Sequence, residues 1–211
     1  MADGCSAGTE SHFAATLVTK ILRRTARQTG LRLFAERATP GPLALLRATT
    51  ATVFSDLARY RTDLSLGPLE LLTTLVLAVV DLPAQTAEII VVGDGVVACN
   101  EEIVVFEQDN KPDYMGYHLA EDFDDYWSRL TQRVSAENVH DLALATDGVF
   151  SLRPFSYDSY PPVTEQELLQ FLLTERSGEI NDTYYRRRLL YVRDHYGLAA
   201  TDDLSVVRLM L

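Results

Sequence analysis

The sequence predicts an α+β domain in which antiparallel strands form layers that helices cover. Segments with helical spacing open the chain, a block of short apolar runs fills its middle, and helical segments followed by one strand close it. The turns inside the strand block are too short for the crossover helices that parallel strands need. Neighbouring strands are therefore expected to pair in antiparallel fashion.

Composition limits the classes of function. The chain has 211 residues, 47% of them hydrophobic, which is enough for one sizeable core, and we expect a single domain over residues 1–211. The formal net charge of -11 opposes nonspecific binding to nucleic acid. No apolar run approaches the roughly 20 residues that cross a bilayer, and the N-terminus lacks a signal-peptide pattern. We expect a cytoplasmic protein that binds neither nucleic acid nor membrane.

Two helices are predicted before the strand block. The first runs from Ser11 to about Thr29, with apolar residues at helical spacing and Gly30 as a stop signal. The second runs from Pro42 to about Arg61. Each has one apolar face available for packing.

The middle and the end of the chain predict strands and helices in turn. Four runs, "TTLVLAVVDL", "AEIIVVGDG", "VVACN" and "EIVVFEQ", predict a meander of neighbouring antiparallel strands. An irregular segment follows, with a short helix around Asp124 to Val134, and "HDLALATDGVF" returns to strand. Thr164 and Glu167 form a capping-box pattern at the start of a helix. A further helix ends near Gly197, and "DLSVVRLML" closes the chain as a strand.

Acidic residues recur where strands begin or end. Asp94 and Asp147 follow apolar runs, Asp202 precedes the last one, and Asp3 stands in the opening "MADG". In antiparallel sheets the end of one strand and the start of its neighbour fall at the same rim. Asp94, Asp147 and Asp202 can therefore line one edge, and Asp3 can join them.

A single Asp-Gly pair is an ordinary turn, but the four acids together indicate a cation site. Mg²⁺ and Mn²⁺ prefer carboxylates, backbone carbonyls and water, and a pair of such ions can activate a water during phosphoryl transfer. A glycine beside a ligand lets the backbone approach closely. The four histidines are scattered, so zinc is not expected.

An ordered series of motifs resembles the type 2C metal-dependent protein phosphatases, in a bacterial style, and covers most of the chain. "ADGCSAG" is similar to the Asp-Gly motif of that family, "LLTTLVLAVV" to its Thr-containing strand, and "VVGDGVVACN" to its Gly-Asp-Ser-Arg turn. "FEQDNKP" resembles its Asp-His-Lys-Pro motif, "LALATDGVFSL" its Ser-Asp-Gly strand, and "TDDLSVVRL" its closing Asp-Asn-Met-Thr strand.

The resemblance implies a fold and a set of metal ligands. The fold is a four-layer sandwich of two antiparallel sheets flanked by helices, with two Mn²⁺ or Mg²⁺ ions at one end. By motif position, Asp3 would bridge the ions, and the Gly4 carbonyl would coordinate one of them. Asp147 and Asp202 would complete the ligation of the other. Asp94 stands where the family has an acid associated with a third, weaker metal.

The activity that the resemblance implies is hydrolysis of phosphoserine and phosphothreonine in proteins by a metal-activated water, with Asp3, Asp147 and Asp202 as the catalytic ligands. The partners would be a phosphorylated protein substrate and a cognate serine/threonine kinase.

Several departures from the family keep other interpretations open. The family has strands before its Asp-Gly motif, with an acidic ligand and a phosphate-binding Arg, whereas only Met1 and Ala2 precede Asp3 here. We therefore expect an N-terminally incomplete domain that lacks the usual first strands. The main alternative is a catalytically inactive, phosphatase-like protein that binds a partner. A small metal-binding structural domain and a nucleophilic Cys5 are further alternatives.

Overall fold

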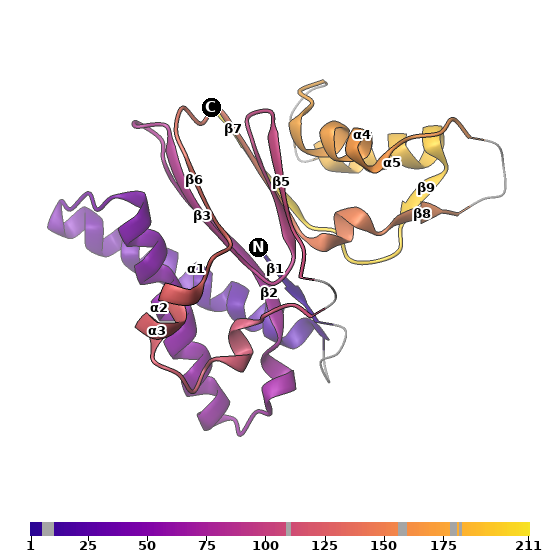
Figure 1. The fold of residues 1–211 in the computed structure, drawn as a ribbon. Helices are drawn as coiled ribbons and strands as arrows, with labels where there is room; N and C mark the ends of the chain where they lie inside the picture. Colours follow the sequence, from indigo (N-terminus) through magenta and orange to yellow (C-terminus); the bar gives the residue numbers. More distant parts are fainter. Residues whose placement is uncertain (6–10, 109–110, 156–159, 178–180, 182) are drawn as a thin grey trace. The chain divides into compact units, whose positions relative to one another are not determined.

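The computed structural model describes residues 1–5, 11–108, 111–155, 160–177, 181 and 183–211. These residues form two compact units (Figure 1). Unit 1 comprises Met1–Asp94 and Phe106–Val139, and unit 2 comprises Gly95–Val105 and His140–Leu211. The chain leaves unit 1 directly after Asp94, so the "GDG" turn connects the two units.

Unit 1 contains a four-stranded sheet with the order β1-β2-β3-β6, and each neighbouring pair is antiparallel. Its strands are β1 (Ala2–Gly4), β2 (Thr73–Asp81), β3 (Thr86–Val92) and β6 (Arg133–Ala136). β2 and β3 are rich in Val, Leu and Ile, which pack well on a pleated surface. These two strands form the centre of the sheet, with the short β1 at the outer side of β2.

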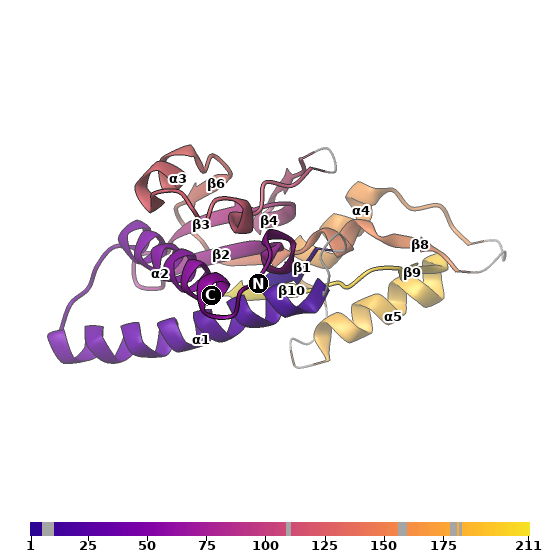
Figure 2. The same cartoon turned by 90° about the horizontal axis from the view of Figure 1, so that it is seen from below.

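Helices of unit 1 pack against this sheet, as Figure 2 shows from below. They are α1 (Ser11–Glu36), α2 (Pro42–Asp63) and α3 (Phe123–Arg129), with short 3₁₀ turns η1 (Pro68–Leu71) and η2 (Met115–Tyr117). The core between them joins Val18 of α1, Leu57 of α2 and Leu75 of β2, each almost completely buried. The apolar faces that the sequence predicts for the first two helices therefore form the core of this unit.

Unit 2 contains a second four-stranded sheet with the order β10-β7-β4-β5. Its strands are β4 (Gly95–Cys99), β5 (Glu102–Phe106), β7 (Asp141–Ala145) and β10 (Val206–Met210). β7 is buried along its whole length and pairs antiparallel with both β10 and β4. A central strand buried on both faces explains the unbroken apolar run "LALA".

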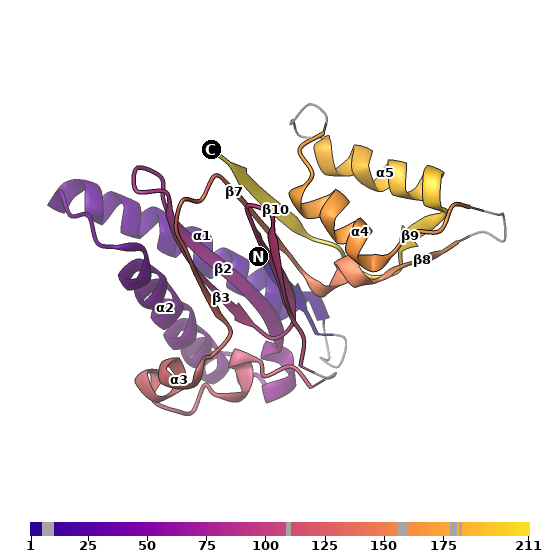
Figure 3. The ribbon, with the colours of Figure 1, turned by 45° about the horizontal axis from the view of Figure 1, so that its top comes forward.

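Two helical segments of unit 2 lie side by side beside a two-stranded sheet of β8 (Leu152–Pro154) and β9 (Leu198–Ala200), as Figure 3 shows. They are α4 (Glu165–Leu169), which continues as the π-helical turn η4 (Gln170–Thr174), and α5 (Tyr184–Tyr196). The buried Leu172 and Val192 belong to the same apolar cluster as Ala143 of β7.

The α+β class, the antiparallel sheets and the helical cover are confirmed, whereas three local predictions are wrong. The short helix predicted around Asp124 to Val134 ends at Arg129, and Val134 belongs to strand β6. The four runs of the strand block do not form one meander, because β2 and β3 pair in unit 1 while β4 and β5 belong to the sheet of unit 2. Gly30 does not end the first helix, which continues to Glu36. Glycine costs only about 1 kcal/mol within a helix, so a favourable helix can continue through it.

Candidate functional site

The backbone of Asp3 and Gly4 is held in place by strand β2. Asp3 pairs with Thr74 and Gly4 with Thr73. The Asp3 N–H donates to Thr74 Oγ1 at 3.1 Å, and the Thr73 hydroxyl donates to the Asp3 carbonyl at 2.5 Å. Gly4 N–H in turn donates to Asp3 Oδ1 at 2.9 Å. Strand β2, through Thr73 and Thr74, therefore fixes the backbone position of both predicted ligands, Asp3 and Gly4.

Asp94 lies in the turn that follows β3. Gly93 has φ +81°, a left-handed conformation that glycine adopts without strain. A Cβ added to Gly93 would also lie 3.1 Å from the Tyr114 ring and 3.2 Å from Thr74 Cγ2. The Gln108 N–H donates to Asp94 Oδ1 at 2.9 Å. The turn is therefore specified by the small residue before Asp94 and by a hydrogen bond to its carboxylate.

Asp3 and Asp94 belong to the same end of the unit 1 sheet. Ala2 of β1 and Val92 of β3 both pair with Leu75 of β2. Each strand then runs on past Leu75 in the direction of Thr74, which brings Asp3 and the Gly93–Asp94 turn to one rim. Antiparallel pairing therefore places Asp3 and Asp94 at the same end of the unit 1 sheet.

In unit 2, Asp147 follows the buried strand β7. Thr146, which is fully buried, pairs by hydrogen bonds with Ser205 just before β10: its N–H donates to the Ser205 carbonyl, and the Ser205 N–H donates to Thr146 Oγ1, both at 3.1 Å. Asp147 then begins the 3₁₀ turn η3 (Asp147–Phe150) and is exposed. The pairing of β7 with β10 thus carries Asp147 to the segment that holds Asp202.

Because Gly148 has no side chain, the segment that contains Asp202 and Asp203 can lie close to the turn that begins at Asp147. A Cβ at Gly148 would overlap the Asp203 carbonyl group and lie 2.8 Å from its carbon, a distance that no side chain tolerates. Ser151 also holds the segment that contains Asp202, because its Oγ accepts a hydrogen bond from the Asp202 N–H at 3.2 Å. Its carbonyl accepts from the Thr201 N–H at 3.1 Å. The structure therefore brings Asp147 and Asp202 together within unit 2.

The electrostatics of this pair favour a cation. Partial burial, followed by the negative charge of Asp202, raises the pKa of Asp147, although backbone N–H groups of Gly148 and Asp147 oppose the shift. Two carboxylates that repel each other gain when a divalent cation neutralises them. The chemistry of the donor set, two carboxylates with solvent access, therefore fits Mg²⁺ or Mn²⁺.

Asp141, at the opposite end of β7, has a structural role that no local sequence pattern indicates. Its carboxylate accepts from Arg208 Nη2 at 2.6 Å and Nε at 2.8 Å, and from Arg176 Nε at 3.0 Å. Burial disfavours its charged form, but the hydrogen bonds from Arg208 and Arg176 lower its pKa overall. Asp141, the first residue of the strand, is paired with cationic side chains, whereas Asp147, after the strand, faces another acid.

Each predicted site residue lies in the described part of the chain: Asp3, Gly4 and Asp94 in unit 1, and Asp147 and Asp202 in unit 2. Over the described residues, no group of three or more His, Cys, Asp or Glu side chains is arranged to hold a metal ion. Each unit therefore supplies part of the predicted ligand set. Of the resembling motifs, residues 6–8 and the Asp109–Asn110 pair lie outside the described residues.

None of the helices in the described part of the chain has the length and apolar character that crossing a bilayer requires.

Comparison with known proteins gives one family match. The family model described as "Protein phosphatase 2C" matches residues 1–183, which is most of the chain. Among curated proteins, no significant match is found.

Solved structures share the fold over the whole chain. A bacterial serine phosphatase that carries a point mutation aligns with a TM-score of 0.61 at 19% identity, covering 100% of this chain and 83% of that one. The serine/threonine phosphatase Stp1 from Staphylococcus aureus aligns with a TM-score of 0.59 at 16% identity, covering 100% and 82%. The serine/threonine phosphatase PstP/Ppp from Mycobacterium tuberculosis gives 0.54 at 18% identity, covering 100% and 86%. At identities this low, the likeness shows a common fold alone.

Proposed function

The chain belongs to the protein phosphatase 2C family, and from this premise we propose that it is a metal-dependent serine/threonine protein phosphatase. The reaction is hydrolysis of a phosphomonoester on a phosphoprotein in the cytoplasm, and a cognate serine/threonine kinase supplies that substrate. Solved structures with this fold that are described as serine/threonine phosphatases support the proposal.

The observation that carries the proposal is the pairing of Asp147 with Asp202. Thr146, Gly148 and Ser151 bring the two carboxylates together although this raises the pKa of Asp147. A purely structural turn has no need for two acids that repel each other. A site that binds a divalent cation does, because the cation converts the repulsion into attraction.

The residues that would hold the ions are Asp3, Gly4, Asp147 and Asp202, with Asp94 as the ligand of a third, weaker ion. Carboxylate and carbonyl oxygens are the donors that Mn²⁺ and Mg²⁺ prefer. When bound, such ions activate water for attack on phosphorus and neutralise the phosphoryl oxygens.

Other residues of the chain hold the proposed ligands in position. Thr73 and Thr74 hold the Asp3 backbone, Gln108 orients the Asp94 carboxylate, and Ser151 holds the Asp202 segment. Groups fixed in this way need little reorganisation during the reaction, which is how an active site lowers a barrier.

A catalytically inactive protein that binds phosphoproteins is the second candidate. The observation that favours it is that each unit, taken by itself, supplies only part of the proposed ligand set. It predicts binding of a phosphopeptide without release of phosphate.

The test is phosphate release from phosphoserine, phosphothreonine and phosphotyrosine peptides by the full chain. We expect release from the first two, loss of activity with a chelator, and recovery with Mn²⁺ or Mg²⁺. Asp202→Asn should lose activity, whereas Glu101→Gln, at an exposed turn, should retain it. Binding without release would favour the second candidate. Hydrolysis that a chelator does not reduce would refute the metal-dependent mechanism.

A further inference from the structure

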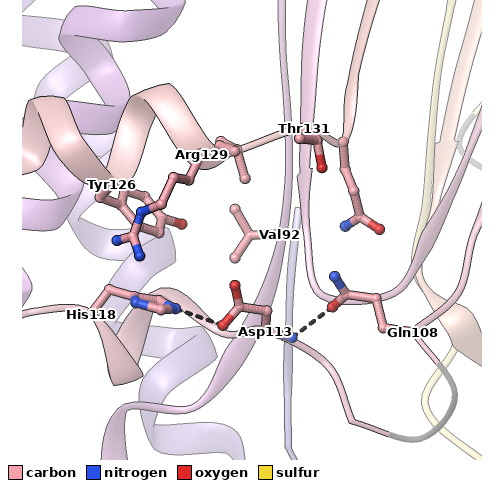
Figure 4. A pocket seen from close by; sticks show the side chains of 9 residues that line it. Val92, Gln108, Asp113, His118, Tyr126, Arg129 and Thr131 are labelled. Carbon is pink, nitrogen blue, oxygen red and sulfur yellow. Dashed lines mark hydrogen bonds and ion pairs between the residues drawn. The ribbon is translucent and has the colours of Figure 1, made fainter.

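Unit 1 contains a cavity of about 150 Å³ that the proposed metal ligands do not use (Figure 4). Val92 and Leu130 supply apolar wall, whereas Gln108, Asp113, Tyr126 and Gln132 are among the polar residues that line it. Its volume corresponds to roughly five water molecules. The cavity is therefore large enough for a short polar side chain.

The buried Tyr126 hydroxyl points into this cavity. Tyr126 is only 4% exposed, and its ring packs against Phe54 and His118 at centroid distances of 5.2 and 5.3 Å. In Figure 4 the hydroxyl lies between Arg129 and Val92. It has no hydrogen-bond partner among the residues that the structure describes. A buried hydroxyl without a partner is costly, so the cavity offers a binding position for a hydrogen-bonding group.

The charged groups around the cavity compensate one another. His118 lies between two carboxylates: Nε2 is 2.6 Å from Asp113 Oδ1, and Nδ1 is 2.7 Å from Glu121 Oε1. Arg129 forms an ion pair with Glu121. Burial opposes protonation of His118, but its hydrogen bonds with Glu121 and Asp113 raise its pKa overall. With His118 protonated, two positive and two negative charges balance, and a charged ligand would disturb that balance.

The Tyr126 hydroxyl stays neutral in these surroundings. Burial, and then the negative charges of Asp113 and Glu121, raise its pKa. It therefore remains a donor at any physiological pH. The matching ligand group is uncharged and carries an acceptor oxygen, such as a carboxamide or a hydroxyl.

The cavity is connected to the turn that holds Asp94. Gln132 Nε2 donates to the Gly93 carbonyl at 2.8 Å and to the Val91 carbonyl at 3.1 Å. Gln108 donates from its N–H to the Asp94 carboxylate, and its Oε1 accepts from the Asp113 N–H at 2.6 Å. Two residues that line the cavity thus hold the turn on which a proposed metal ligand lies.

We propose that this cavity binds an uncharged polar side chain of the phosphoprotein substrate, close in sequence to the phosphorylated residue, with the Tyr126 hydroxyl as hydrogen-bond donor. The proposal rests on the proposed function, because the occupant belongs to the substrate. It makes Tyr126 a specificity-determining residue.

The test uses a phosphothreonine peptide with alanine at every flanking position, and a series in which asparagine replaces one alanine at a time. Binding is measured by fluorescence polarisation to the full chain carrying Asp147→Asn, so that turnover does not consume the peptide. We expect one asparagine peptide to bind about 3- to 10-fold more tightly than the all-alanine peptide, the effect of one hydrogen bond. Aspartate or lysine at that position should give no gain.

Tyr126→Phe, added to the same chain, should abolish the preference without lowering thermal stability, because the hydroxyl it removes has no partner among the described residues. Tyr117→Phe is the matched control, since Tyr117 is 49% exposed, and it should keep the preference. Equal binding of all peptides, as for a cavity that holds only water, overturns the proposal, as does a preference that survives Tyr126→Phe.

Phosphate release from the same peptides by the wild-type chain with Mn²⁺ separates this proposal from the proposed function. Release without any asparagine preference overturns only the cavity proposal. A preference that depends on Tyr126, without release, supports the cavity and contradicts the phosphatase activity.

Discussion

Gly148 and Asp203 approach so closely that a Cβ on Gly148 would overlap the Asp203 carbonyl group, 2.8 Å from its carbon. This contact lies between the turn that begins with Asp147 and the segment that contains Asp202. The approach of the two acids therefore depends on the absence of a side chain at Gly148.

Gly148→Ala should destabilise the chain by about 1–3 kcal/mol, because the added methyl group forces the two segments apart. Metal-dependent activity should fall at least about 10-fold, since displacement of a catalytic group by as little as 1 Å is costly. Thermal unfolding and phosphate release measure both effects. Gly30→Ala is the matched control: no atom of the described residues lies within 4 Å of its added Cβ, and in this exposed helical position it should stabilise by about 0.5–1 kcal/mol. If Gly148→Ala and Gly30→Ala had the same stability and the same activity, the close contact at Gly148 would not be what holds the two acids together.

Asp147→Asn should stabilise the metal-free chain. The folded-state pKa of Asp147 is raised by burial and by Asp202, so its ionised form costs stability at neutral pH, and this cost disappears as the pH falls through the folded pKa towards 3.8. We expect a Tm increase of only about 1–2 °C at pH 7, because the carboxylate is only partly desolvated and solvent screens its repulsion from Asp202.

In millimolar Mn²⁺ the wild-type chain should have a higher Tm than Asp147→Asn, the reverse of the order without metal. The ion should raise the Tm of the wild-type chain, because it binds only the folded state, and it should have little effect on Asp147→Asn. A Tm that Mn²⁺ leaves unchanged in both proteins would argue against a cation site at Asp147.

Arg208→Ala should destabilise the chain by about 3–5 kcal/mol, because it leaves the buried Asp141 carboxylate with an incomplete set of partners. Arg176→Ala, whose side chain is 49% exposed, should cost about 1 kcal/mol or less. The pKa of Asp141 is lowered from 3.8, so the stability that the pair contributes is present above that pH. It is lost as the pH falls through the folded pKa. We would measure the free energy of unfolding in urea over a pH series. The values for the two variants should approach that of the wild type only in acid.

His118→Gln should lower the Tm in a pH-dependent way. Hydrogen bonds with Glu121 and Asp113 raise the pKa of His118 above 6.5 despite its burial. The contribution of protonated His118 is therefore complete below pH 6.5 and is lost as the pH rises through the folded pKa. The wild-type chain should exceed the variant by about 2 °C in mild acid, with a smaller difference in mild base. A constant difference between the two proteins would show that His118 acts through packing alone.

Local signals predicted the ends of several elements, including the strand that precedes Asp147. Thr164 and Glu167 form the capping box that the sequence predicts, and Gly197, with φ +65°, ends the last helix. Asp147 follows a buried strand because an apolar run before an Asp-Gly pair has few other conformations available.

Long-range relationships could not be predicted in the same way. The "GDG" turn was expected to join neighbouring strands, yet the chain passes there from one sheet to the other. The role of Asp141 depends on Arg208, which is 67 residues away, and no local pattern connects them. The division of the proposed ligands between two units likewise follows from tertiary pairing, and the single domain over residues 1–211 stays a prediction.

The most direct test of the proposed phosphatase is Mn²⁺-dependent hydrolysis of p-nitrophenyl phosphate by the 211-residue chain, with Asp147→Asn beside it. We predict turnover that requires Mn²⁺ and falls by at least about 100-fold in the variant, because the variant loses a metal ligand. A well-folded chain without turnover in Mn²⁺, or a variant as active as the wild type, would contradict the proposed function.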